Sequence, residues 1–332
     1  MPSLEQIQPH VARGVNYRLV SVYIVDKPIG MTSFDVVARA RKILNTRRIG
    51  HTGTLDPLAT GVLVLTVDDS TKLVQFLETD SKSYLAFVSF GADTPTLDAE
   101  GPILETAATN LTLDQIKAAL EPFRGAQMQL PPSYSAIHIN GERAYDLARK
   151  GLEVKLQPRA VTVTRLEAQL LLGSMREFAR LEYRAALDGT GDWIASPNGD
   201  QFTFPAPLGD FQTVMLNVSV SSGTYIRSLA RDLGAALGVP AHLAGLVRTR
   251  VGKFGLSDAT SLEALGSATS KPDLEALSLP QLEVDPPSAR QIRDGKRFAH
   301  TYVGRAMVTL DGALVAAVEG DGERLRVLRA WQ

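Results

Sequence analysis

Apolar residues recur along this chain with two periods, about two residues and about 3.6 residues, and these periods predict where strands and helices lie. Strands are expected where β-branched and apolar residues run together or alternate with polar ones. Such segments are residues 19–25, 61–67, 84–90, 160–188 and 211–221. Strands and helices follow one another without a regular βαβ spacing, so the pattern predicts an α+β fold built on a mixed or antiparallel central sheet.

Helices are expected where apolar residues return every three to four positions behind a capping residue. The first follows a cap at Thr32 or Ser33, and another begins at Thr112, where Gln115 completes a capping box. The last ends at Gly238, a residue suited to the left-handed position after a helix. The expected helices cover residues 33–44, 71–78, 112–121 and 224–237.

Three further segments differ from this core in composition. Residues 189–212 are rich in Gly, Pro and Asp and predict an inserted, acidic loop. Residues 256–285 show no strong period and end before two prolines, which predicts a linker. Residues 286–332 alternate as short strands with Asp-Gly turns, so we expect a small β-rich C-terminal domain after a main domain at 1–255.

The composition narrows the chemistry. The chain of 332 residues is 44% hydrophobic and 21% charged, which is typical of a folded globular protein. It has no cysteine and its five histidines are isolated, so we expect no disulfide, thiolate chemistry or metal site. The glycine-rich motifs that hold nucleotide phosphates are absent, so no cofactor is expected. Apolar runs are too short for a membrane span, and no signal-peptide core is visible, which predicts a cytoplasmic protein.

The formal net charge of −1 conceals a segregation of charge. Residues 13–50 carry eight basic and two acidic residues, residues 222–254 five and one, and residues 286–332 eight and five. Acidic residues concentrate at 93–122 and 256–285. Three basic segments can fold into one basic face for nucleic acid on a neutral protein, whereas solvated arginines on separate helices are the simpler alternative.

The densest candidate for chemistry is a loop, Gly50-His51-Thr52-Gly53-Thr54-Leu55-Asp56-Pro57-Leu58-Ala59-Thr60-Gly61. Its three glycines and one proline predict a fixed, irregular loop that leads into a buried strand. Asp56 would project from this loop, which is a rigid mount for a catalytic carboxylate. An Asx turn or a cap is the structural alternative for an Asp-Pro pair.

The second candidate is Ser222-Gly223-Thr224-Tyr225-Ile226-Arg227-Ser228-Leu229. Arg227 falls in the first turn of a predicted helix, where the helix dipole disfavours a cation. We therefore expect an anionic partner, and a buried guanidinium could keep Asp56 ionised and aim it. A surface arginine is the alternative, because the local sequence does not encode pairing with Asp56.

Two aromatic residues are further candidates. Tyr84 begins an alternating strand, where a core tyrosine and an aromatic platform for a nucleobase are both open. His51, in the basic region, could be a stacking wedge or an ordinary loop residue.

Five stretches of the chain, in order, carry a family resemblance. They are Asp26-Lys27-Pro28-Ile29-Gly30-Met31-Thr32-Ser33; His51 to Gly61; Pro131-Pro132-Ser133-Tyr134-Ser135-Ala136 continuing to Gly141-Glu142-Arg143-Ala144-Tyr145; Gly223-Thr224-Tyr225-Ile226-Arg227; and Leu246-Val247-Arg248-Thr249 with Gly252-Lys253-Phe254. They resemble the signature motifs of the bacterial TruB family of tRNA pseudouridine synthases and span about 70% of the chain.

The resemblance implies an enzyme that isomerises uridine to pseudouridine at position 55 in the T-loop of tRNA, by base flipping and without a cofactor. It implies the pseudouridine synthase fold for residues 1–255, with an RNA-gripping insertion at about 95–155, and a PUA-like RNA-binding domain at 286–332. The implied partner is the tRNA T-arm. No obligate protein partner is expected, and the implied state is a monomer.

The resemblance also implies roles for matched residues. Asp56 is the catalytic aspartate, Arg227 pairs with it, and Tyr84 stacks on the target base. His51 fills space beside the flipped nucleotide, and Leu246 contacts the base. The remaining residues assigned to RNA or pocket contacts are Lys27, Pro28, Thr54, Tyr225 and Arg248.

Three other functions compete with this one. An archaeal or eukaryotic relative that works in a guide-RNA particle is disfavoured by the insertion at 95–155. A non-catalytic RNA-binding protein or tRNA-folding chaperone would not need Asp56 and Arg227 together, although folding assistance could accompany catalysis. A cofactor-free glycosidase would need a second carboxylate, and no motif supplies one.

Overall fold

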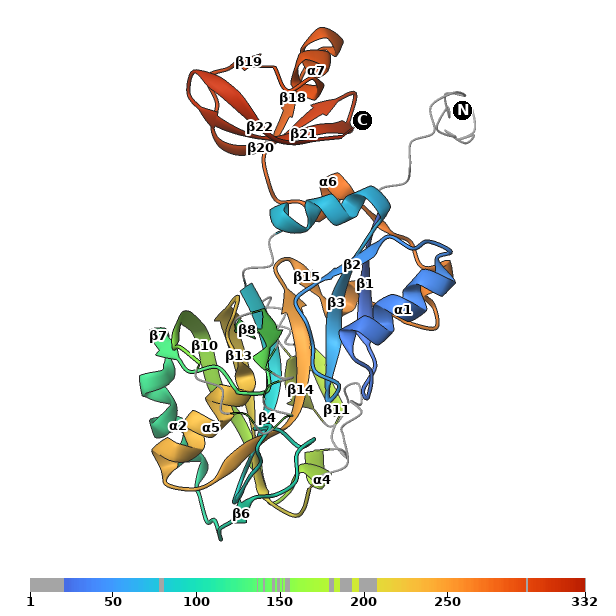
Figure 1. Cartoon of the computed structure of the whole chain (residues 1–332). Helices are drawn as coiled ribbons and strands as arrows, with labels where there is room; N and C mark the ends of the chain where they lie inside the picture. Colours follow the sequence, from blue (N-terminus) through green and yellow to red (C-terminus); the bar gives the residue numbers. More distant parts are fainter. Residues whose placement is uncertain are drawn as a thin grey trace, which may run out of the picture.

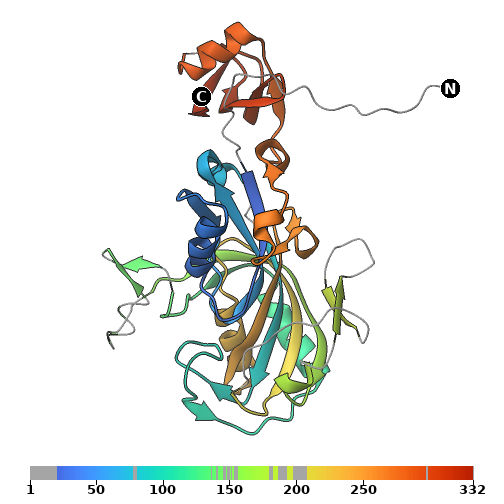
Figure 2. The ribbon, with the colours of Figure 1, turned by 90° about the vertical axis from the view of Figure 1, so that its right-hand side faces the viewer.

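The computed structural model describes residues 21–331 except 78–80, 136, 140, 145–146, 148–149, 151, 153–155, 179–181, 186–192, 197–207 and 297. Figure 1 shows a long sheet flanked by helices, with a separate β-rich domain at one end of the molecule, and Figure 2 shows the same arrangement from the side. None of the described helices is long and apolar enough to cross a lipid bilayer.

A mixed sheet forms the main domain. Its strands are β1 (Ser21–Lys27), β2 (Ile49–Thr52), β3 (Ala59–Val67), β4 (Ser81–Phe90), β7 (Gly125–Gln129), β10 (Arg159–Leu172), β13 (Gln212–Ser221), β14 (Ala241–Val251), β15 (Phe254–Gly255), β16 (Thr260–Ser261) and β17 (Lys271–Pro272). The main path runs β16-β1-β3-β14-β4-β13-β10-β7. Among the described pairs of this sheet, only β3–β14 and β1–β16 are parallel. This confirms the predicted mixed sheet.

Successive residues of a strand face opposite sides of the sheet, and here both sides carry apolar residues that pack against helices. Tyr84, Ala86 and Val88 of β4 share one core with α2 (Leu113–Leu120) and α5 (Ile226–Leu237). Leu85 and Phe87 enter another core beside α4 (Met175–Phe178). The helix α1 (Ser33–Ile43) packs on β1 and β3.

The predicted helix starts at Thr32 and Thr112 are confirmed. Both residues accept a hydrogen bond from a backbone N–H in the first turn, in complete capping boxes. Gly238 ends α5 at φ 71°, as predicted. The expected helix at 71–78 is instead a 3₁₀ helix, η1 (Asp68–Phe76). The expected strand at 160–188 is interrupted by α4.

Short elements fill the segments between the large ones. The small strand pairs are β5 (Ala92–Asp93) with β6 (Glu105–Thr106), β8 (His138–Ile139) with β9 (Glu142–Arg143), and β11 (Glu182–Ala185) with β12 (Trp193–Ser196). A 3₁₀ turn, η2 (Glu121–Phe123), follows α2. Much of the predicted acidic loop at 189–212, and part of the predicted insertion at 95–155, lie outside the described residues.

Residues 256–285, expected as a linker, pack against the main sheet. They form η3 (Leu256–Asp258), η4 (Leu265–Ser267), α6 (Asp273–Ala276) and the strands β16 and β17, which pair with β1. Local periodicity does not reveal this, because each element is only two to four residues long.

The predicted β-rich C-terminal domain is confirmed as a five-stranded sheet with one helix. Its elements are β18 (Gln281–Glu283), α7 (Pro286–Arg293), β19 (Phe298–Ala299), β20 (Val303–Leu310), β21 (Ala313–Asp321) and β22 (Arg324–Ala330). Trp331 packs against Phe76 of η1 with ring centroids 6.3 Å apart, and both belong to a core that spans the two domains. The C-terminal domain is therefore docked on the main one.

Candidate active site

Asp56 lies in the loop between β2 and β3, and the start of α1 holds this loop. The Ser33 hydroxyl donates to the Leu55 carbonyl at 3.2 Å and accepts from the Leu55 N–H at 2.8 Å. The Gly30 N–H donates to the Pro57 carbonyl at 2.8 Å. Bonds on both sides of Asp56 fix the backbone, so the predicted rigid mount is present.

Two buried cations support the same loop. Arg248 is fully buried on β14, where its Nε donates to the Val62 carbonyl at 2.7 Å and a terminal nitrogen to the Gly53 carbonyl at 3.0 Å. Lys27 is fully buried at the end of β1, and its ammonium donates to the carbonyls of Pro28 and Met31. Burial lowers the pKa of Lys27 to about 8. The resemblance assigned both side chains to RNA or pocket contacts, and in the structure both bind backbone carbonyls of the loop region.

Arg227 meets Asp56 from the first turn of α5. Its Nε lies 3.0 Å from the Asp56 carboxylate, and a terminal nitrogen lies 3.3 Å from the Asp98 carboxylate. The guanidinium also donates to the carbonyls of Thr96 and Tyr134, at 3.0 and 2.9 Å. The side chains of Arg227 and Asp98 are 8% and 2% exposed, whereas that of Asp56 is 38% exposed. Arg227 therefore has the predicted anionic partner, and Asp56 alone of the three is open to a substrate.

Asp98 is a member of this cluster that was not among the expected site residues. The Thr96 hydroxyl and the Glu100 N–H donate to its carboxylate at 2.6 and 3.0 Å. Burial raises the pKa of Asp98, and Arg227 opposes that shift. At the rim of the site, partial enclosure by the protein and the neighbouring carboxylates of Asp98 and Asp56 raise the pKa of Glu100 to about 7. In the sequence, Asp98 was visible only as part of the acidic segment 93–122. Local residue spacing could not show that it pairs with Arg227.

An apolar wall stands beside Asp56. Tyr84 is buried on β4, directly across the sheet from Arg248, whose guanidinium is hydrogen bonded to its side chain. Burial raises the pKa of the Tyr84 hydroxyl. Leu246 of β14 pairs with Ala59 of β3, and Leu55, Leu246 and Tyr84 share one apolar cluster. These three side chains are only 4 to 8% exposed, so the wall beside the Asp56 carboxylate is apolar and almost fully covered.

The other expected residues surround this wall. His51 is half-buried on β2, and its ring meets the Phe34 ring edge-on at 5.4 Å. Burial lowers the pKa of His51, which favours the neutral imidazole. Thr54 is exposed on the loop. The Tyr225 backbone exchanges two hydrogen bonds with the Gln129 amide, at 2.8 and 3.0 Å.

Gly61 is where the strand that follows the Asp56 loop comes closest to β14. It has φ +100°, and a Cβ there would lie 2.2 Å from the Arg248 carbonyl oxygen. We expect Gly61→Ala to lower the free energy of unfolding by about 3 kcal/mol, from backbone strain and displacement of β14. Urea unfolding measures this value. Gly125→Ala is the matched control, because Gly125 has φ +83° and open space around its Cβ position, so only about 1 kcal/mol is expected. Equal losses would contradict a role for the close approach.

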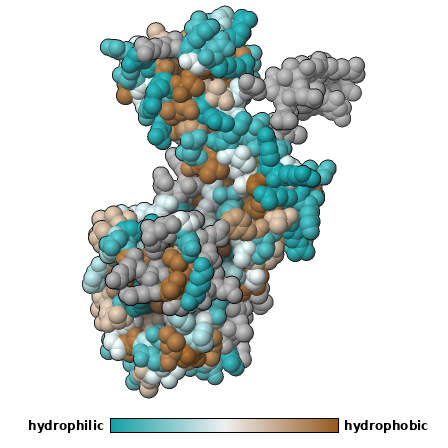
Figure 3. All heavy atoms as spheres, viewed as in Figure 1, coloured by the Kyte–Doolittle hydropathy of each residue, from teal (hydrophilic) through white to brown (hydrophobic). Residues whose placement is uncertain are grey.

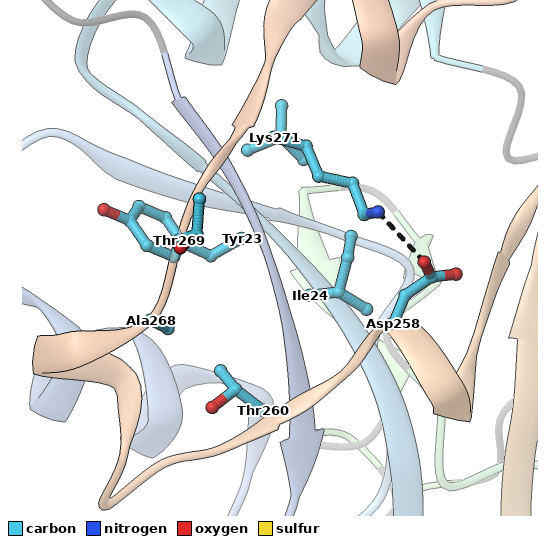
Figure 4. A pocket seen from close by; sticks show the side chains of 8 residues that line it. Tyr23, Ile24, Asp258, Thr260, Ala268, Thr269 and Lys271 are labelled. Atoms are coloured by element: carbon cyan, nitrogen blue, oxygen red, sulfur yellow. Dashed lines mark ion pairs between the residues drawn. The ribbon is translucent and has the colours of Figure 1, made fainter. Parts of the chain in front are cut away.

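A cavity lies apart from the Asp56 site. A pocket of about 240 Å³ opens beside β1, and Figure 4 shows Tyr23, Thr260 and the Asp258–Lys271 ion pair around it. Its lining shares no residue with the Asp56 site, and its two charged side chains neutralise each other at 2.9 Å. Across the part of the chain that is described, no group of three or more His, Cys, Asp and Glu side chains has the arrangement of a metal site.

Comparison with protein families identifies the chain. The model of the TruB family pseudouridylate synthase N-terminal domain matches residues 41–182, and that of the tRNA pseudouridylate synthase B C-terminal domain matches residues 227–280. The chain belongs to the TruB family. It is therefore a pseudouridine synthase, which is an isomerase.

Individual relatives agree with this membership of the TruB family. The tRNA pseudouridine synthase B of Deinococcus deserti is 56% identical over 93% of this chain and 99% of its own length. That of Thermus thermophilus is 44% identical over 94% of this chain and 99% of its own length. Among solved structures, a Cbf5-Nop10-Gar1 complex includes a chain with a TM-score of 0.62 and 23% identity, covering 94% of this chain and 85% of that one. This likeness confirms the predicted pseudouridine synthase fold.

Proposed function

We propose that this enzyme converts uridine to pseudouridine in the T-loop of tRNA, at position 55, with Asp56 as the catalytic group. The observation that carries the proposal is the pairing of a half-exposed Asp56 with a buried Arg227 beside the apolar wall of Tyr84 and Leu246. The relatives named tRNA pseudouridine synthase B support tRNA as the substrate.

The reaction needs only what these side chains offer. The N1–C1′ bond breaks, the uracil turns, and a C5–C1′ bond forms, while C5 loses a proton and N1 gains one. There is no net oxidation and no second substrate, so neither a cofactor nor a metal is required. A carboxylate can act as nucleophile toward the sugar or the base, or as a base at the sugar. The uridine must leave its stack before Asp56 can reach it.

Each neighbour then has a role in the same proposal. Arg227 aims the Asp56 carboxylate, and Tyr84 and Leu246 receive the flipped uracil on an apolar surface. His51 fills space beside the flipped nucleotide, and Pro28, Thr54 and Tyr225 border the pocket. Lys27 and Arg248 act through the loop that they hold, because both are buried against backbone carbonyls.

We further propose that the enzyme works as a monomer in the cytoplasm, on tRNA alone. The insertion at about 95–155 and the PUA-like domain at 286–332 would grip the T-arm outside the pocket. This arrangement would give the protein, rather than a guide RNA, the task of recognising the substrate.

The test is an assay of the purified chain on an unmodified tRNA transcript and on the isolated T-arm hairpin. We expect pseudouridine at position 55 of the full tRNA, located by sequencing of the product. Product on tRNA but not on the hairpin would assign part of recognition to regions beyond the T-arm. No pseudouridine in either RNA would overturn the proposed function.

A further inference from the structure

The outward face of α1 is unlike the exposed face of an ordinary helix. Val36, Val37 and Ala40 bury one side of α1 against β1 and β3. At 100° per residue the exposed positions of α1 fall on two sides. Asp35 and Arg39 lie on one side, and Phe34, Ala38, Arg41 and Lys42 lie on the other, followed by Asn45 just beyond the helix; this second side is called the strip. With 1.5 Å of rise per residue the strip extends about 12 Å from Phe34 to Lys42, away from the Asp56 loop.

Phe34 begins the strip with a large aromatic ring left in solvent. Its exposed fraction is 61%, although a buried phenylalanine would be more stable by about 2 kcal/mol. The ring centroid lies 5.4 Å from that of His51, and the two ring planes are nearly perpendicular, at 79°. The preceding residue, Ser33, is the one that holds Leu55 beside Asp56. A largely exposed aromatic ring therefore stands next to the catalytic loop.

Two further residues of the strip, Arg41 and Lys42, are basic, and neither forms an ion pair with a carboxylate among the described residues. Lys42 has no carboxylate partner among the residues that the structure describes, and Arg41 donates to the Ile49 carbonyl of β2, at 3.3 Å. The nearby Arg48, by contrast, forms an ion pair, with 2.7 Å between its guanidinium and the Asp69 carboxylate. Residues 33–48 hold five basic residues and one acidic residue. In Figure 3 the surface over α1 is largely hydrophilic.

We propose that this strip binds the RNA strand beside the target uridine. The Phe34 ring stacks on a nucleobase next to the flipped one, and Arg41 and Lys42 pair with phosphates further along the strand. An aromatic ring followed by cations without acidic partners is the composition that binds single-stranded nucleic acid. Phe34 lies ahead of both ranges matched by the family models, so the assignment rests on geometry alone. The inference builds on the proposed function, since it takes RNA as the substrate of the adjoining pocket.

The stacking role is tested by three substitutions at one position, with RNA affinity measured in an Asp56→Asn background. Phe34→Ala should weaken tRNA binding roughly tenfold, and Phe34→Leu nearly as much, because leucine keeps the contact with His51 but has no π face. Phe34→Tyr should retain wild-type affinity. Thermal unfolding of each variant is recorded as well. Equal affinities for all three would overturn stacking, as would a loss that simply follows the melting temperature.

The phosphate contacts are tested by the dependence of binding on salt. The double variant Arg41→Gln/Lys42→Gln should lower the slope of log K against log salt by about 0.7 to 0.9 for each phosphate that is no longer neutralised. These cations also favour a helix C-terminus, but that effect changes stability and not the salt slope. Arg176→Gln is the control, because Arg176 is 61% exposed on α4, outside the strip. Equal slopes for the double variant and the control would overturn the proposal.

The two proposals can fail separately. A wild-type chain that forms no pseudouridine in tRNA would overturn the proposed function. A fully active wild-type chain whose strip variants bind tRNA as Arg176→Gln does would overturn only the role of α1.

Discussion

Asp56→Asn is expected to abolish pseudouridine formation, with a fall in rate of more than about 10⁴-fold, while tRNA affinity stays within a few-fold of wild type. The amide has almost the shape of the carboxylate, so the loop held by Ser33 and Leu55 is undisturbed. It lacks the negative charge that a nucleophile or base needs. The rate is followed by release of a tritium label from C5 of uridine, because that position exchanges its hydrogen for the sugar bond.

Asp232→Asn is the matched control for this variant. Its carboxylate is 34% exposed and lies 2.8 Å from the Arg231 guanidinium, so it resembles Asp56 in exposure and in having an arginine partner. It lies within α5, outside the cluster formed with Asp98. We expect normal activity from it. An active Asp56→Asn enzyme would show that another group performs the reaction.

The local sequence was sufficient for elements whose signals are themselves local. The two capping boxes span four residues each, and both helices begin where the spacing predicted. The loop at Asp56 was likewise visible from its own glycines and proline. The helix predicted at 71–78 is the nine-residue 3₁₀ helix η1, because apolar spacing over so few turns does not distinguish a 3₁₀ helix from an α helix.

Local sequence patterns could not predict interactions between segments that are distant in the chain. Asp98 and Arg227 are 129 positions apart, and only the folded sheet brings them to 3.3 Å. Arg248 and Lys27 were assigned to RNA or pocket contacts on the family resemblance alone. Both are buried with backbone carbonyls as partners, which is a use of charge that composition does not reveal.

Arg227→Met is expected to reduce kcat at saturating tRNA by about 10² to 10³-fold while changing the Kd for tRNA by only a few-fold. The guanidinium contacts Asp56, Asp98 and two carbonyls, and it lies behind the carboxylate rather than on the open side of the pocket. Its loss leaves Asp56 without the group that aims it. The same change leaves Asp98 buried and unpaired, which costs about 3 to 5 kcal/mol of stability. Kinetics must therefore be measured well below the melting temperature of the variant.

Arg227→Lys separates the effect of Arg227 on the orientation of Asp56 from its effect on stability. Lysine keeps the positive charge for Asp98 but cannot reach two carboxylates and two carbonyls at once, because an ammonium lacks the planar fork. We expect most of the stability to return while kcat remains at least about tenfold below wild type. Arg231→Met, one turn further along α5 and 29% exposed, should change neither quantity appreciably. If either substitution at Arg227 raised only KM, the guanidinium would be a substrate contact. Full recovery of kcat in Arg227→Lys would mean that charge alone, without the fork, is what Asp56 requires.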